Sequence, residues 1–172
     1  MILKRFLILL YSCFLGGAVI AQTSDQESNL KAAFIYNFTK YIDWGKYSDR
    51  NEFVIGVLGD SPVANSLEQI AKDYTVNNKP IVVHILDRLS RVSDCDILFI
   101  SKNCRFSLSS ILSAVGKGVL TISEQPGDAE DGTAFNFIIV NNQLKFEANL
   151  KAISSAGLKA GSQLLKLAKI VE

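Results

Sequence analysis

The chain has 172 residues and a formal net charge of +1, and 48% of its residues are hydrophobic. This length suits one domain that buries its own hydrophobic core and needs no disulfide bonds for stability. A balanced charge without a run of lysine or arginine argues against a nucleic-acid-binding protein.

The N-terminal segment is typical of a cleaved export signal. Two basic residues precede an almost charge-free apolar run, Phe6–Ile20. Val19 and Ala21 stand three and one positions before the expected cut, where signal peptidase requires small residues. We predict a signal peptide over residues 1–21 and a periplasmic domain over residues 22–172.

Two alternatives concern membrane anchoring. The apolar run is shorter than the about 20 residues of a transmembrane helix. A lipid anchor at Cys13 is the second alternative, since Leu10 and Ser12 suit a lipoprotein signal but bulky Tyr11 does not. Cleavage after Ala21 would leave 16 basic and 17 acidic residues, a net charge of −1.

The mature chain opens with a predicted amphipathic helix. Ser24–Glu27 has the form of a capping box at its start. Apolar residues then recur at four-residue spacing, and we expect the helix to end near Gly45. The predicted buried stripe consists of Leu30, Phe34, Phe38 and Ile42.

Strands and helices then alternate. Continuous apolar runs predict four strands buried on both faces, namely Phe53–Leu58, Ile81–Leu86, Ile97–Ile100 and Val119–Ser123. Helices are predicted at Pro62–Tyr74 and Ser107–Val115. Strands separated by helices imply crossover connections and a mainly parallel sheet.

The C-terminal part of the chain changes pattern. True alternation in Phe135–Val140 and Gln143–Glu147 around Asn141-Asn142 predicts a β-hairpin in which Phe137 faces Phe146. A long helix is predicted from about Asn149 to Ile170. The fold class is therefore a three-layer α/β domain with a mixed, mainly parallel sheet, an antiparallel hairpin and a long C-terminal helix.

Few residues carry recognisable chemistry. His84 stands in an apolar strand without a neighbouring nucleophile or acid, so we expect a structural histidine. The strand between Cys95 and Cys104 would hold them roughly 25–30 Å apart, too far for a disulfide. No catalytic set, metal-ligand pattern or cofactor motif is present, so we predict no enzyme, no metal and no cofactor.

A glycine turn offers a candidate ligand site. Gly59, Asp60 and Ser61 lead from a predicted strand into a helix N-terminus, the geometry that cradles phosphates. The turn lacks the third glycine of a dinucleotide fingerprint and the lysine of a P-loop, and Asp60 repels anions. A capped turn without a ligand is the alternative.

A candidate partner surface lies at the open end of the hairpin. Phe135, Glu147 and Ile153 would form an apolar pocket with a charged rim, as interface hot spots do. In the alternative, Phe135 and Ile153 are ordinary core residues, and Glu147 pairs with Lys145 or caps the following helix.

Taken in order, several segments resemble the YfiR-like family of bacterial periplasmic regulators. They are Leu30–Trp44, Phe53–Asp60, Asp96–Ser101, Leu120–Ser123, Phe135–Phe137, Leu144–Leu150, Ala156–Lys159 and Gln163–Ala168. The resemblance implies a regulator that restrains a membrane-bound diguanylate cyclase by binding its periplasmic part. It also implies an outer-envelope protein that sequesters the regulator.

The resemblance leaves two points open. Some members of the family carry disulfides, but this chain has too few cysteines for two bridges. A periplasmic sensor of nucleotides or amino acids is the alternative function, and a second copy of the chain is an alternative partner.

Overall fold

The computed structural model describes residues 18–45 and 50–171, with side chains from Asp25 onward. Residues 1–17 of the predicted signal peptide, and Cys13 with them, lie outside this range. Among the described residues, no helix combines the length and apolar character needed to cross a bilayer.

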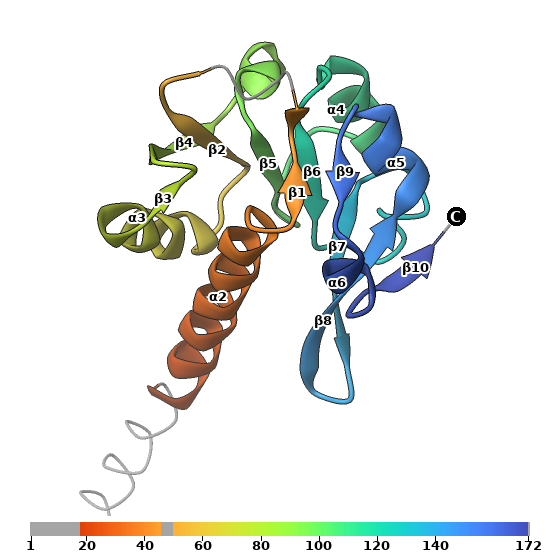
Figure 1. Ribbon diagram of the computed structural model, residues 1–172. Helices are drawn as coiled ribbons and strands as arrows, with labels where there is room; N and C mark the ends of the chain where they lie inside the picture. Colours follow the sequence, from red (N-terminus) through yellow and green to blue (C-terminus); the bar gives the residue numbers. More distant parts are fainter. Residues whose placement is uncertain (1–17, 46–49, 172) are drawn as a thin grey trace, which may run out of the picture.

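The centre of the fold is an eight-stranded sheet in the order β10-β8-β7-β6-β5-β2-β4-β3 (Figure 1). Its strands are β2 (Phe53–Leu58), β3 (Thr75–Val76), β4 (Lys79–Leu86), β5 (Ile97–Ile100), β6 (Leu120–Ser123), β7 (Phe135–Val140), β8 (Gln143–Asn149) and β10 (Lys169–Val171). Within this sheet of the described residues, only the β3–β4 and β7–β8 pairs are antiparallel. The prediction of a mixed, mainly parallel sheet is confirmed.

Helices cover both faces of this sheet. The helices whose apolar residues pack into the larger core cluster are α2 (Ala18–Phe38), α3 (Val63–Asp73), α5 (Leu150–Ser155) and α6 (Ser162–Leu165). The 3₁₀ segment η2 (Leu89–Asp94) and helix α4 (Leu108–Ala114) pack into the smaller cluster. Val57 belongs to the first cluster and Leu58 to the second, as expected of successive residues of a strand buried on both faces.

The C-terminal hairpin has the predicted register. Asn136 pairs with Glu147, Phe137 with Phe146, and Val140 with Gln143. Asn141 and Asn142 have φ values of 51° and 59°, the left-handed conformation that a two-residue hairpin turn requires.

The predicted long helix over Asn149–Ile170 is wrong. Asn149 caps α5 by accepting a hydrogen bond from Ala152 N–H at 2.8 Å, but the helix ends at Ser155. Gly157 has φ +79°, and the following N–H, of Leu158, bonds back to the Ile153 carbonyl at 3.1 Å, which closes a Schellman motif.

A second glycine, Gly161, lets the chain approach Tyr41 closely just before the short helix α6 begins. The N–H of Gly161 bonds to the Tyr41 carbonyl at 2.7 Å, and a Cβ there would lie 3.2 Å from that oxygen. This close approach lets β9 (Lys159–Ala160) pair with β1 (Ile42–Asp43) in a small antiparallel sheet.

The N-terminal helix also differs from its prediction. Helix α2 runs through Ser24 without a break, so the capping box does not start a helix in the full chain. The helix ends at Phe38, before the predicted end near Gly45. Ile42, a residue of the predicted helix, belongs to β1. Of the predicted stripe, Leu30 is 46% exposed, whereas Phe38 and Ile42 are buried as predicted. Ala32 and Ile35 join Phe38 on the buried side of the helix.

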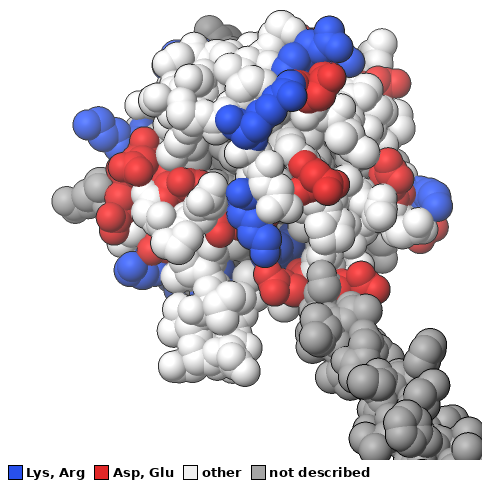
Figure 2. All heavy atoms as spheres, turned by 180° about the vertical axis from the view of Figure 1, so that it is seen from behind, with Lys and Arg blue, Asp and Glu red and all other residues white. Residues whose placement is uncertain are grey.

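The surface carries both charges. On the face shown in Figure 2, acidic and basic side chains are interspersed. The described residues on this face therefore do not form the continuous basic surface that nucleic-acid binding requires.

Candidate functional site

The sheet topology singles out one crevice. Strand β2 connects through α3 to β4 on one side of it, whereas β5 connects through α4 to β6 on the other side. The carboxyl ends of β2 and β5 therefore meet where the winding of the sheet reverses, which is the usual ligand position in open α/β sheets. The loops that leave these two ends are Gly59–Ser61 and Ser101–Asn103.

The two loops are tied together. Ser101 Oγ donates a hydrogen bond to the Asp60 carbonyl at 2.7 Å, and Asn103 Nδ2 donates to the same oxygen at 3.1 Å. Gly59 has φ +91°, and a Cβ there would lie 2.9 Å from Cys104 Cα. The turn after β2 therefore needs glycine for its conformation and for the close approach of the next loop.

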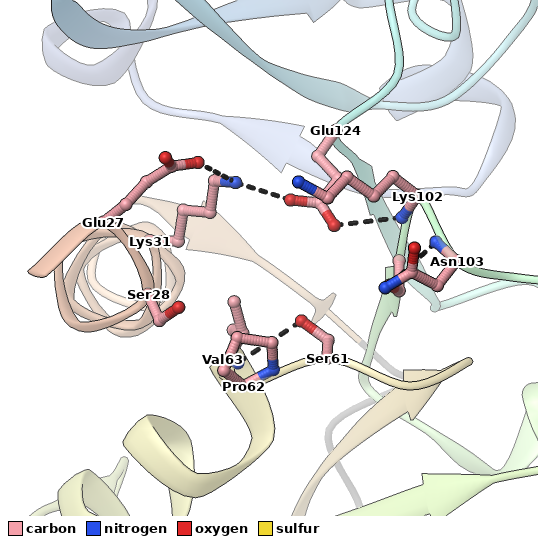
Figure 3. Close-up of a pocket in the computed structure, with 10 residues that line it drawn as sticks. Glu27, Ser28, Lys31, Ser61, Pro62, Val63, Lys102, Asn103 and Glu124 are labelled. Carbon is pink, nitrogen blue, oxygen red and sulfur yellow. Dashed lines mark hydrogen bonds and ion pairs between the residues drawn. The ribbon is translucent and has the colours of Figure 1, made fainter. Parts of the chain in front are cut away.

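A cavity of about 60 Å³ opens between these loops and α2 (Figure 3). Its lining includes Glu27, Lys31, Ser61, Ser101, Lys102 and Glu124. Lys31 Nζ lies 2.5 Å from Glu124 Oε2 and 2.5 Å from Glu27 Oε1. The second oxygen of Glu124 accepts the Lys102 N–H at 2.9 Å. One ammonium therefore links helix α2 to the loops at the carboxyl end of the sheet.

Lys31 is charged in this environment. Burial opposes the charged form, but hydrogen bonds and attraction from Glu124 and Glu27 outweigh it and raise the pKa of the Lys31 ammonium. The side chains of Lys31 and Glu124 are only 8% and 5% exposed. This part of the crevice is therefore occupied by a buried ion pair.

The helix N-terminus beside the cavity does not offer a phosphate cradle. The N–H of Val63 bonds to Ser61 Oγ at 3.3 Å, and the N–H of Ala64 bonds to the Ser61 carbonyl at 3.2 Å. The first donors of α3 are thus satisfied by the protein, and the nearby carboxylates of Asp60 and Glu124 repel anions. The strand-to-helix turn therefore satisfies its own first donors, and ligand binding at Gly59–Ser61 stays a prediction.

The family model described as YfiR/HmsC-like matches residues 28–169, most of the chain. The chain belongs to the YfiR/HmsC-like family. This family consists of periplasmic regulators connected with diguanylate cyclase signalling, and its members are regulators rather than enzymes. The matched range includes Lys31, both loops of the crevice and Glu124.

In this YfiR/HmsC-like domain, the three predicted partner-binding residues are buried. Phe135, Glu147 and Ile153 are 0%, 6% and 3% exposed, so the expected exposure of Phe135 and Ile153 is wrong. Phe135 packs against Phe38 with ring centroids 4.7 Å apart. The aromatic side chains of β7 are needed to fill the space under α2, which explains their burial.

Glu147 lies on the other side of the sheet from Phe135. The two side chains point to opposite faces, because Phe135 pairs with Ala148 whereas Glu147 pairs with Asn136. Glu147 accepts hydrogen bonds from Asn136 Nδ2 at 3.0 Å and Lys169 Nζ at 2.8 Å. Its partner is thus Lys169, not Lys145. Burial raises the carboxyl pKa, but these two bonds outweigh it, so the pKa of Glu147 is lowered.

The predicted ligand-site residues do lie together. Ser61 lines the small cavity, whereas Gly59 and Asp60 line two neighbouring hollows that meet at Ile85. Sequence reasoning missed Lys31 and Glu124. The spacing of Glu27 and Lys31 by four residues in a predicted helix was a usable signal, since such residues share a helix face.

The remaining candidates show no shared site. His84 is half-buried in β4, and Cys95 and Cys104 are both free thiols, as predicted. Within the described residues, no group of three or more histidine, cysteine and acidic side chains is placed to hold a metal ion.

Proposed function

We propose that the protein is an exported, non-enzymatic regulator that restrains a membrane-bound diguanylate cyclase by binding its periplasmic part. The observation that carries this proposal is the YfiR/HmsC-like match over residues 28–169. Export is supported by the basic start and the apolar run Phe6–Ile20. N-terminal sequencing of the periplasmic protein should begin at Gln22; an acylated Cys13 would contradict this part of the proposal.

The partner is proposed to bind over the junction of β8 and α5. Two apolar residues near this junction, Leu150 and Ile170, are each 44% exposed. Glu147 holds Lys169 at the surface, while Phe135 and Ile153 supply buried support from beneath. An outer-envelope protein that sequesters the regulator would compete with the cyclase.

Direct binding tests this proposal. The mature protein, immobilised as bait in envelope extract, should retain a diguanylate cyclase, and the purified periplasmic part of that enzyme should bind it. Glu147→Ala should weaken this binding, and Lys145→Ala is the control on the neighbouring exposed position. If no cyclase binds, the proposed function is wrong. If Glu147→Ala lowers only the melting temperature and the folded protein binds normally, only the location of the surface is wrong.

A second candidate function is sensing of a small periplasmic ligand, a nucleotide or an amino acid, at the crevice around Gly59, Asp60 and Ser61. The position of this crevice at the switch point of the sheet favours it. A ligand that binds only the folded protein raises the melting temperature by mass action. Screening nucleotides and amino acids should reveal a shift that Asp60→Asn changes; no shift from any of them would exclude this candidate.

A further inference from the structure

The two edges of the sheet are protected to different degrees. At one edge, β10 has only three residues and begins with Lys169, features that discourage pairing with another chain. At the other edge, β3 pairs with only Lys79 and Pro80 of β4. No described strand covers the outer side of Ile81–Leu86, a run that contains no acidic residue, lysine, arginine or proline.

The backbone groups on this open edge can be assigned. Gly59 N–H donates to the Leu86 carbonyl, so the N–H and C=O of Leu86 face β2. These groups alternate in direction along a strand, so those of His84 also face β2. The N–H and C=O of Val83 and Ile85 therefore point outward, as they would to pair with another strand.

The edge ends beside two hollows. One, of about 360 Å³, lies against α3 and is lined by Asp60, Pro62, Asn65 and Ile85. The other, of about 290 Å³, includes Leu86 and Phe106 of the smaller core cluster and so lies toward the opposite face of the sheet. Ile85 borders both hollows and is 66% exposed, unusual for an isoleucine in a strand.

We propose that the outer edge of β4 at Val83 and Ile85 binds an extended segment of a partner protein as an added strand. Successive side chains of a strand point to opposite faces, so neighbouring residues of the segment can enter the two hollows. The hollow toward Phe106 takes an apolar side chain. Asp60 borders both hollows. The hollow toward Phe106 also holds Arg105, whereas Asp60 is the only charged residue among the described residues that line the hollow against α3, so that hollow takes lysine or arginine.

Charge favours such a segment over a second copy of this chain. In an antiparallel pair of two β4 strands, the residues opposite Ile85 and Leu86 would come from the apolar start of the run, Ile81–Val83. They would place apolar side chains over the Asp60 carboxylate, which is unfavourable. This surface lies at the opposite end of the strand order from β8 and β10, so it goes beyond the proposed cyclase-binding region.

The test uses the purified mature protein and a blocked peptide, Thr-Val-Thr-Val-Lys-Val-Thr-Val-Thr, with a second peptide in which glutamate replaces lysine. Amide hydrogen exchange is followed by NMR. In the free protein, the Val83 and Ile85 amides should exchange rapidly while His84 is protected. A saturating concentration of the lysine peptide should slow the exchange of the Val83 and Ile85 amides by tenfold or more.

Variants with matched exposure locate the effect. Ile85→Lys should weaken peptide binding at least tenfold, because a charge on an edge blocks pairing. Ile139→Lys, at a residue 57% exposed on β7, should change binding by less than about twofold. An exposed ion pair with Asp60 should make the lysine peptide bind more tightly than the glutamate peptide, by about fivefold at most. Asp60→Asn should remove this preference.

Three results would overturn the proposal. They are an absence of peptide-dependent protection at millimolar peptide, equal binding of the two peptides, and concentration-dependent protection of Val83 and Ile85 in the free protein. The last result would assign the edge to a second copy. Because no cyclase is present in the assay, each result leaves the proposed regulatory function unaffected.

Discussion

Replacing Lys31 by methionine tests whether the buried ion pair holds α2 onto the sheet. The substitution keeps an unbranched side chain of nearly the same length but leaves Glu124, 5% exposed, without its cation. Removing one partner of a buried pair typically costs about 3–5 kcal/mol. Because Glu124 keeps its hydrogen bond from Lys102 N–H, we expect a loss near the lower limit, about 3 kcal/mol.

This loss corresponds to a fall in melting temperature of about 6–12 °C for a domain of this size. Thermal unfolding followed by circular dichroism measures it. Glu27→Gln is the control: Glu27 is 45% exposed, so its loss should stay below about 1 kcal/mol. Adding Glu124→Gln to Lys31→Met should recover most of the stability, since no uncompensated buried charge remains.

The pH dependence gives an independent check. The folded-state pKa of Lys31 is raised above its ordinary value of 10.5, so its contribution is complete below pH 10.5 and disappears as the pH rises through the folded-state value. The difference between wild type and Lys31→Met should therefore persist at neutral pH and shrink in strongly alkaline solution. A loss below about 1 kcal/mol at pH 7, or a double variant as unstable as Lys31→Met, would refute this reasoning.

Three further predictions concern stability and reactivity. Glu147→Gln should be less stable than wild type above pH 4.5, and the difference should disappear as the pH falls through the lowered folded-state pKa of Glu147. Urea titrations from pH 7 to pH 3 measure the difference in stability. A difference that persists at pH 3 would contradict the prediction. Gly56→Ala should cost about 1–3 kcal/mol because its Cβ would overlap Cys95 Sγ and lie 2.9 Å from Leu86 Cδ1. Cys95→Ala should relieve part of this cost in the double variant, and an unchanged melting temperature for Gly56→Ala would be the contrary result. A maleimide should label Cys104 in the native protein but Cys95 only after unfolding, because burial raises the pKa of Cys95 to about 11. Mass spectrometry measures the labelling of each cysteine. Equal labelling of Cys95 and Cys104 in the native protein would contradict this prediction.

Local patterns predicted the strands and the hairpin well. A continuous apolar run such as Ile97–Ile100 has few alternatives to a strand buried on both faces, and the pair Asn141-Asn142 is sufficient to set the hairpin register. The C-terminal region was harder to predict. Apolar residues and glycines at helical spacing suggest one long helix. Gly157 takes a left-handed conformation that ends α5, and Gly161 lets the chain approach Tyr41.

The site shows the limit of reasoning from one sequence. The turn Gly59–Ser61 was recognisable because its chemistry is local. The link between Lys31 and Glu124 joins residues 93 positions apart, so it depends on how α2 crosses the carboxyl end of the sheet. Similarly, no local pattern shows that β4 lies at an edge, because that depends on the strand order.

Cyclic di-GMP measured in deletion strains tests the regulatory role most directly. Deleting this protein should raise cyclic di-GMP, because the restrained cyclase becomes active. Each membrane-bound diguanylate cyclase with a periplasmic part is then deleted in turn in the same strain. We predict that removing one of them abolishes the rise. No rise after the first deletion, or a rise that survives every cyclase deletion, would contradict the proposed function.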